Sequence, residues 1–240
     1  MLTQDYSKYT NEDQDVWSIL FKRQLAVVGD VAYAQFKKSI NDLRFTSAAI
    51  PFFNETNEHL KQLTGWQLYA VPGLIDNDKF FRWMTEKKFG ATTWLRKKEQ
   101  LDYLEEPDMF HDVFGHVPLL ADLLISDYLF SLAETAKRFN YNEEVVTAVS
   151  RLYWYTIEFG LVKENGAVKI YGAGILSSPG ETKYCLSDEA TRIDADLQQM
   201  IAHPYIINSF QQQYHVLQSM HQLKLISEEL NHYLQSKYSV

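Results

Sequence analysis

The sequence predicts a mainly helical α+β protein in which short strands and hairpins connect the helices. Apolar residues recur at every third or fourth position over most of the chain, which is typical of amphipathic helices. The runs rich in β-branched and aromatic residues are short, and they end at turn signals such as Pro-Gly and Asn-Gly. No internal repeat or low-complexity linker divides the chain, so we expect residues 1–240 to form a single domain.

Composition argues against several classes of function. The net charge of −8 and the pI near 5.4 are opposite in sign to the basic surface that nucleic-acid binding requires. No apolar run reaches membrane-spanning length, and the first residues carry no export signal. The single cysteine, Cys185, cannot form an intrachain disulfide and suits a reducing compartment. We therefore expect a cytoplasmic protein that binds neither nucleic acid nor membrane.

The N-terminal third is expected to serve as scaffold. Thr10 carries the signature of a helix start, and helically spaced apolar residues follow it. A second helix is expected over about residues 30–43. A third helix, capped by Asn54 or Thr56, should end at Gly65.

Residues 66–96 are expected to shape the wall of a pocket. The predicted elements are a strand over residues 66–71, a helix opened by Asp76 or Asn77 and ended by Gly90, and a strand over residues 92–95. Arg96 would follow the second strand directly. At a strand end, its guanidinium could hold a carboxylate through two parallel hydrogen bonds.

The segment 107–120 is the most informative part of the sequence, because it places His111 and His116 five residues apart. Five residues of ideal α-helix turn by about 500°, so the two imidazoles would point roughly 140° apart. They can reach one metal ion only if the helix ends or distorts between them. Gly115 followed by Pro118 is where we expect that to happen. The alternative is a pair of core histidines that bind nothing.

A third candidate ligand lies in a long helix expected over residues 143–159. Glu158 is the one acid in its aromatic C-terminal part, and such a carboxylate is costly to bury unless it is paired or binds a metal. It could instead face solvent. Two histidines with one carboxylate are the ligand set of a non-haem Fe(II) centre with open positions. A zinc hydrolase remains an alternative, although no His-Glu-x-x-His helix is present to supply its general base.

The remaining elements follow from turn and helix signals. We expect a helix over residues 126–139, a hairpin with a type I′ turn at Asn165-Gly166, a close backbone approach at Gly172–Gly174, a helix opening near Pro179, and then a helix, a strand near 205–217 and a final helix.

Three longer motifs carry a resemblance to a known family. They are Leu-Asp-Tyr-Leu-Glu-Glu-Pro-Asp-Met-Phe-His-Asp-Val-Phe-Gly-His-Val-Pro-Leu at 101–119, Leu-Tyr-Trp-Tyr-Thr-Ile-Glu-Phe-Gly-Leu at 152–161, and Ile-Tyr-Gly-Ala-Gly-Ile-Leu-Ser-Ser at 170–178. With these motifs, the chain resembles the pterin-dependent aromatic amino acid hydroxylases, and within them the bacterial phenylalanine 4-hydroxylases. The resemblance covers nearly the whole chain. Leu104 departs from the threonine of the animal branch but fits the bacterial pattern.

The resemblance implies a role for each matching residue. The metal ligands would be His111, His116 and Glu158. The substrate would be bound by Arg96, which grips its carboxylate, with Asp108, Pro107, Trp154, Phe159, Gly174 and Ser177. The pterin would contact Gly73, Ile75, Phe80, Asp112 and Tyr153, of which Phe80 stacks on its ring. Asp112 and Tyr153 would also act in catalysis.

The implied function is a non-haem Fe(II), tetrahydropterin-dependent monooxygenase that converts L-phenylalanine to L-tyrosine with O2. Residues 66–181 would carry the active site of a monomeric catalytic domain without a regulatory domain, whose partners are small molecules only. Hydroxylation of tryptophan or of the meta position of phenylalanine, a zinc hydrolase and a non-catalytic aromatic-amino-acid binder are the alternatives. An indole at Trp154 and an apolar side chain at Ile207 favour phenylalanine.

Overall fold

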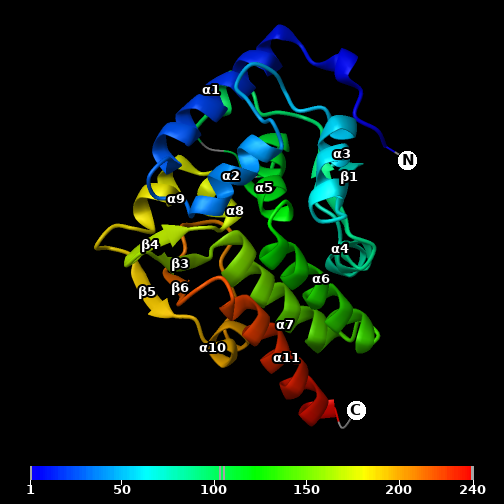
Figure 1. Cartoon of the computed structure of the whole chain (residues 1–240), viewed down its shortest axis with the longest axis vertical. Coiled ribbons are helices and arrows are strands. Elements are labelled where there is room, and N and C mark those ends of the chain that lie inside the picture. Colours follow the sequence, from blue (N-terminus) through cyan, green and yellow to red (C-terminus); the bar gives the residue numbers. More distant parts are fainter. Residues whose placement is uncertain (1, 103, 105, 239–240) are drawn as a thin grey trace.

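The protein is described by a computed structural model that covers residues 2–102, 104 and 106–238 (Figure 1). Tyr103 and Glu105 of the motif at 101–119 lie outside the described residues. Helices form most of the molecule and short strands connect them, as the sequence predicts. The helices are η1 Tyr6–Lys8, α1 Asn11–Val28, α2 Ala34–Asp42, α3 Phe53–Leu63, α4 Asn77–Met84, η2 Lys98–Gln100, η3 Phe110–His116, α5 Val117–Leu120, α6 Leu123–Arg138, α7 Glu143–Tyr153, η4 Trp154–Glu158, α8 Ala173–Leu176, α9 Pro179–Tyr184, α10 Leu197–Ala202 and α11 Gln222–Tyr238.

The strands form two small sheets. β1 Gln67–Val71 and β2 Lys88–Thr92 pair in parallel. The second sheet has the order β4-β3-β6-β5, built from β3 Leu161–Glu164, β4 Ala167–Ile170, β5 Thr191–Asp194 and β6 Gln213–Leu217. The β3–β4 hairpin turns through Asn165 at φ 52° and Gly166 at φ 79°, so the predicted type I′ turn is confirmed. β5 was not predicted.

The start of α1 is confirmed, but the next two helices begin elsewhere than expected. The Thr10 backbone N–H donates to the Asp13 carboxylate over 2.8 Å, which completes a capping box. α2 begins only at Ala34, because residues 31–33 instead exchange backbone hydrogen bonds with Ile170. α3 begins at Phe53, whose N–H donates to the Gln4 side chain over 2.8 Å. The predicted caps Asn54 and Thr56 therefore lie inside α3.

The predicted ends of the helix and the strand within residues 85–95 are wrong. α4 ends at Met84, and Lys87 at φ 52° turns the chain directly into β2. Gly90 therefore lies within the strand, opposite Tyr69 of β1, and does not end the helix. A Cβ at position 90 would lie 3.0 Å from Val71 Cγ1, so a close approach explains this glycine. Arg96 lies four residues beyond the strand and does not end it.

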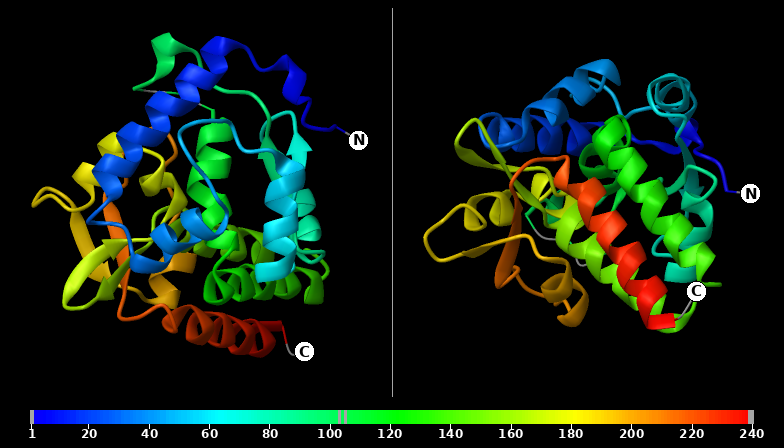
Figure 2. Two further views of the ribbon diagram at one scale, coloured as in Figure 1. Left: turned by 45° about the horizontal axis from the view of Figure 1, so that its top comes forward. Right: turned by 60° about the horizontal axis from the view of Figure 1, so that its bottom comes forward.

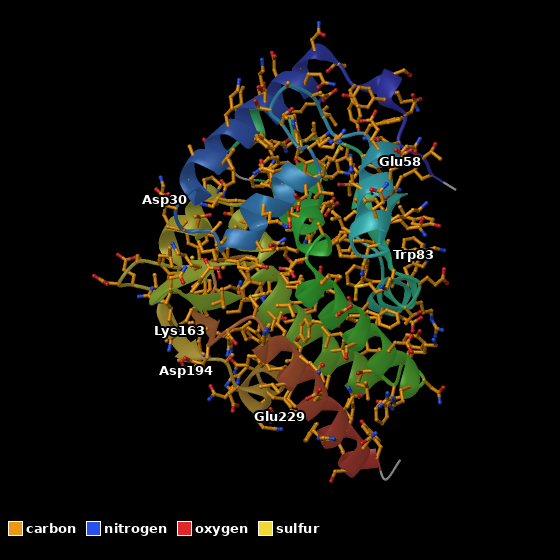
Figure 3. The ribbon with its side chains drawn as sticks, viewed as in Figure 1. Asp30, Glu58, Trp83, Lys163, Asp194 and Glu229 are labelled. Carbon is orange, nitrogen blue, oxygen red and sulfur yellow. The ribbon has the colours of Figure 1, made fainter. Side chains whose placement is uncertain are left out.

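The long helices α6, α7 and α11 pack side by side, and the four-stranded sheet lies next to them (Figures 1 and 2). α1 and α2 cover the opposite end, and one hydrophobic core of buried residues joins all these parts. Charged side chains such as Asp30, Lys163, Asp194 and Glu229 lie at the exposed surface (Figure 3). Nearly all side chains of η3, and those of Tyr155, Thr156 and Ile157 in η4, are buried.

Within the described residues, no single helix combines the length and the apolar composition that a membrane span requires. One bent pair, Phe110–Leu120 with Leu123–Arg138 at 102°, meets both criteria by length and composition alone.

Candidate metal centre and active site

The two histidines come together because η3 is a π-helix over its whole length, Phe110–His116. A π-helix closes i→i+5 hydrogen bonds, so residues five apart point to nearly the same side. The Nε2 atoms of His111 and His116 are accordingly 3.2 Å apart. The predicted distortion between the histidines is confirmed, although it occupies the whole segment and not only Gly115.

Glu158 reaches the histidines from a second π-helix. The helix expected over residues 143–159 changes from α7 to η4 at Trp154, and the Phe159 N–H donates to the Trp154 carbonyl over 3.0 Å. Glu158 Oε1 lies 3.0 Å from His116 Nε2, and Oε2 lies 3.8 Å from His111 Nε2. The chain then folds back so closely that a Cβ at Gly172 would lie 2.5 Å from the Glu158 carbonyl.

This group of three side chains fits a metal ion. One ligand atom from each of the three lies within 4.8 Å of the others. Two donors held at right angles, each about 2.1 Å from an ion, are about 3.0 Å apart, which is close to the two shorter separations observed. Ligands from one side only would leave the remaining positions open to other molecules.

Electrostatics keeps the carboxylate charged. Burial opposes the ionisation of Glu158, but the neighbouring His116 and His111 more than offset it and hold its pKa at about 2. Burial lowers the pKa of His111, which favours the neutral form that binds metals. Burial also opposes a charge on His116, but Glu158 more than offsets this effect and raises its pKa, so metal binding here competes with protonation of His116.

Ser177 fixes the tautomer of His111. The Ser177 hydroxyl donates to the Ala173 carbonyl over 2.8 Å, and its oxygen lies 2.8 Å from His111 Nδ1. Because the hydroxyl has one proton, Nδ1 must carry the hydrogen of the second bond. The unprotonated Nε2 of neutral His111 therefore points toward His116 and Glu158.

Arg96 and Asp108 form a buried ion pair behind the metal centre. The Nε and Nη2 atoms of Arg96 donate to the two carboxylate oxygens of Asp108, each over 2.9 Å. The backbone N–H groups of Arg96 and His111 also donate to this carboxylate. Burial disfavours the charge on Asp108, but Arg96 more than offsets it and lowers its pKa. One edge of the guanidinium is thus occupied, and only its Nη1/Nη2 end remains for a substrate carboxylate.

A pocket of about 290 Å³ adjoins the metal centre. Ten of the predicted site residues line it: Gly73, Ile75, Phe80, Pro107, His111, Asp112, His116, Tyr153, Trp154 and Glu158. The other predicted residues are not among its lining residues: Arg96, Asp108 and Ser177 are buried, and Phe159 and Gly174 are half-buried. A larger groove of about 800 Å³ beside Tyr6 and His59 contains none of the predicted residues.

Phe159 and Gly174 contact residues that line the pocket or lie close to them. Phe159 packs on Trp154 with ring centroids 4.8 Å apart. A Cβ at Gly174 would lie 3.0 Å from the Phe159 ring and 3.1 Å from the Glu158 carbonyl, so the absence of a side chain there lets both approach. The predicted close approach at residues 172–174 is therefore confirmed.

The other side of the pocket is lined by Phe80, Tyr153 and Asp112. Phe80 meets Tyr153 edge to face, with centroids 5.2 Å apart, and the Tyr153 hydroxyl lies 3.4 Å from His116 Nδ1. Asp112 Oδ2 accepts hydrogen bonds from the Thr92 backbone N–H over 2.7 Å and from its hydroxyl over 2.8 Å. Burial raises the pKa of Asp112.

Sequence reasoning missed several lining residues, among them Leu74, Asn77, Thr92, Ser150 and Tyr205. Tyr205 stacks on Trp154, with centroids 4.2 Å apart and planes 12° apart. No local signal could have revealed this contact, because the two rings are far apart in the sequence. Ile207 does line the pocket, but 76 % of it is exposed. Because water can reach a ring placed beside Ile207, the expectation that its apolar side chain favours phenylalanine does not follow from this open arrangement.

Comparisons with known proteins agree with the motifs and the geometry. The family model described as biopterin-dependent aromatic amino acid hydroxylase matches residues 5–240. Phenylalanine-4-hydroxylase of Chromobacterium violaceum is 41% identical over 226 residues, which cover 92% of this chain and 75% of the relative. Phenylalanine-4-hydroxylase of Caulobacter vibrioides is 40% identical over 227 residues, covering 94% of this chain and 77% of the relative.

Solved structures extend this similarity to the fold. The Chromobacterium violaceum phenylalanine hydroxylase with bound iron (III) and oxidised 7,8-dihydrobiopterin matches with a TM-score of 0.91 at 39% identity, covering 98% of this chain and 86% of that chain. The cold-active phenylalanine hydroxylase of Colwellia psychrerythraea, without ligands, matches with a TM-score of 0.90 at 34% identity, covering 98% of this chain and 94% of that chain.

Proposed function

The chain belongs to the family of biopterin-dependent aromatic amino acid hydroxylases, and we infer from this membership that it is an iron- and pterin-dependent phenylalanine 4-monooxygenase. It converts L-phenylalanine to L-tyrosine with O2. The observation that best supports this function is that His111, His116 and Glu158 lie together beside an aromatic pocket. The family membership leaves the zinc-hydrolase alternative without support, and the intact ligand group does the same for a non-catalytic binder.

His111, His116 and Glu158 would hold the iron, since the spacing of their ligand atoms and the tautomer of His111 both suit it. Bound iron and a tetrahydropterin supply the activation of O2 and two of the four electrons that the reaction consumes; phenylalanine supplies the other two. The protein provides orientation and keeps water away from the reacting atoms.

For the substrate, we propose that Arg96 binds the amino-acid carboxylate through its free Nη1/Nη2 end. Asp108 occupies the other edge and so fixes the plane of the guanidinium. Ser177 orients His111. Pro107 and Trp154 form the wall against the aromatic ring, supported by Phe159 and by the space above Gly174.

For the cofactor, we propose that the pterin ring stacks on Phe80, between the backbone of Gly73 and Ile75 and the carboxylate of Asp112. The position of these residues on one side of the same pocket supports this assignment. Asp112 has one oxygen left to accept from a pterin N–H, because its other oxygen is held by Thr92. Tyr153 packs against both Phe80 and His116, and it would thereby hold the proposed pterin-stacking ring at a fixed position relative to the metal ligands.

We propose further that residues 1–240 act as one catalytic domain, as a monomer, in the cytoplasm. The acidic charge and the single buried cysteine support an intracellular enzyme of small molecules.

Product analysis tests the function. The purified chain is supplied with Fe(II), a tetrahydropterin, O2 and each aromatic amino acid in turn, and products are separated against ortho-, meta- and para-tyrosine standards. We expect para-tyrosine from phenylalanine, and no product without O2 or pterin. Predominant 5-hydroxytryptophan or meta-tyrosine would refute the specificity, and turnover with zinc in the absence of O2 would refute the reaction class.

A further inference from the structure

Gln211 lies in the irregular connection formed by residues 203–212, between α10 and β6, and is 4% exposed. Its side-chain Oε1 accepts from the Trp154 indole N–H over 2.9 Å, and its Nε2 donates to the Ile206 carbonyl over 2.9 Å. The indole N–H can only donate and the carbonyl can only accept. These two partners therefore fix the orientation of the amide, and of the common side chains only glutamine combines this length with both roles.

This amide connects the residues that face the substrate pocket. Trp154, Tyr205 and Ile207 all line it, and Tyr205 stacks on the Trp154 ring. Gln211 holds the edge of that indole with one end and the backbone between Tyr205 and Ile207 with the other. One side chain thus links the position of the Trp154 indole to the backbone of the segment 203–212 at Ile206.

The backbone of Gln211 is also hydrogen-bonded to α9, the helix that follows Ser177. Its backbone N–H donates to Glu181 Oε1 over 3.1 Å, and the Tyr214 hydroxyl donates to the same oxygen. Glu181 is 5% exposed and belongs to α9, which begins two residues after Ser177. One short stretch of chain therefore orients His111 through Ser177 and the substrate wall through Glu181.

The start of the segment is fastened to the same helix that carries Trp154. The Arg151 guanidinium donates to the Ile201 carbonyl over 2.6 Å, and the Tyr155 hydroxyl donates to the Pro204 carbonyl over 3.2 Å. These two bonds hold the entry of the segment, whereas its pocket-lining middle is held by Gln211.

We propose that Gln211 is a positioning residue for substrate specificity: it fixes the Trp154 indole and the segment 203–212 so that a single six-membered ring is held over the metal centre. The inference rests on the proposed function. A loosened wall places the ring less accurately and admits water, so more pterin is oxidised without hydroxylation. Gln211 itself touches no reacting atom and acts through Trp154.

The test is a double-mutant cycle with Gln211→Met and Trp154→Phe in the iron-loaded enzyme. Methionine keeps the length of glutamine but makes neither hydrogen bond. We expect Gln211→Met to weaken phenylalanine binding roughly three- to tenfold, measured by anaerobic calorimetry, and to lower the yield of tyrosine per pterin oxidised. The Trp154→Phe background lacks the indole N–H. In that background, Gln211→Met should weaken phenylalanine binding by a smaller factor, whose logarithm is less than half of that in the wild-type background.

Gln212→Met is the matched control, because Gln212 is the exposed neighbour and its side chain makes no hydrogen bond to the described residues. Gln212→Met should change neither the phenylalanine affinity nor the yield of tyrosine per pterin oxidised. Both quantities are measured per folded, iron-loaded molecule, so a loss of stability alone leaves them unmoved. If Gln211→Met does not fold, Gln211→Glu replaces it, since its second oxygen opposes the Ile206 carbonyl, and the yield of tyrosine per pterin must again fall.

Two results separate this inference from the proposed function. A wild-type enzyme that makes no tyrosine refutes the function itself. A wild-type enzyme that makes tyrosine, together with a Gln211→Met variant whose binding and yield match it within experimental error, refutes the role of Gln211. An equal effect of Gln211→Met in both backgrounds also refutes it, because the residue would then not act through Trp154.

Discussion

Replacing Asp108 by asparagine should destabilise the enzyme strongly, although the two side chains have nearly the same shape. Asp108 is 0% exposed and accepts from four donors: the backbone N–H, Nε and Nη2 of Arg96 and the backbone N–H of His111. In the variant, the amide oxygen can replace only one carboxylate oxygen. The amide NH2 group would face N–H donors, and the Arg96 charge would be left buried without a partner.

Breaking a buried ion pair by removing one partner costs about 3–5 kcal/mol. For a chain of 240 residues this corresponds to a fall in Tm of roughly 6–20 °C. The measurement is urea and thermal unfolding of wild type and variant, both in chelator, so that iron binding does not add to the difference. A loss below about 1 kcal/mol at pH 7 would refute the argument.

The pH dependence of this difference provides a second check. The pKa of Asp108 is lower in the folded protein than its ordinary value of 3.8, so its ionisation stabilises the fold. That contribution is fully present above the ordinary value and is lost as the pH falls through the lower folded-state pKa. The gap in free energy of unfolding between wild type and Asp108→Asn should therefore be constant from pH 7 to about pH 4 and narrow below it. A gap that widens on acidification would contradict the sign.

Four further variants test the site. Arg96→Lys should raise the KM for phenylalanine roughly tenfold or more, because one ammonium cannot serve Asp108 and a substrate carboxylate with two-pronged geometry; a KM within twofold of wild type would remove Arg96 from substrate binding. Glu158→Gln, like His116→Ala, should keep the fold and abolish tight Fe(II) binding, so that added iron raises the Tm of the wild type only; a variant that retains full iron and turnover would overturn the ligand assignment. Ser177→Ala frees the tautomer of His111 and should weaken iron affinity roughly 10- to 100-fold in an equilibrium titration, whereas unchanged affinity would show that the hydroxyl plays no part.

Local signals predicted what depends on neighbouring residues. The capping box of Thr10, the Asn165-Gly166 turn and the proline at the start of α9 are all where the sequence places them. The sequence also singled out His111, His116 and Glu158, and the structure brings these three side chains together into a group that could hold a metal ion. Glycine was ambiguous: Gly90 was read as a helix end, while a close approach between strands is what requires it.

Contacts between residues that are distant in the sequence could not be predicted from the sequence. The stacking of Tyr205 on Trp154 and the hydrogen bonds of Gln211 join parts of the chain that no periodicity relates. The occupation of one edge of Arg96 by Asp108 is likewise a matter of three-dimensional geometry, since the sequence shows only that both residues are present. The exposure of Ile207 depends on the path of an irregular segment, which composition does not determine.

The two π-helices make the site depend on backbone geometry as much as on residue type. Each places a ligand by accommodating one more residue per hydrogen-bonded ring than an α-helix does. If the segment between His111 and His116 relaxed to ordinary α-helix at the same length, the two imidazoles would turn about 140° apart, while most of its apolar side chains could still pack. Such a relaxation would yield a folded protein that has lost its metal while keeping every candidate ligand residue.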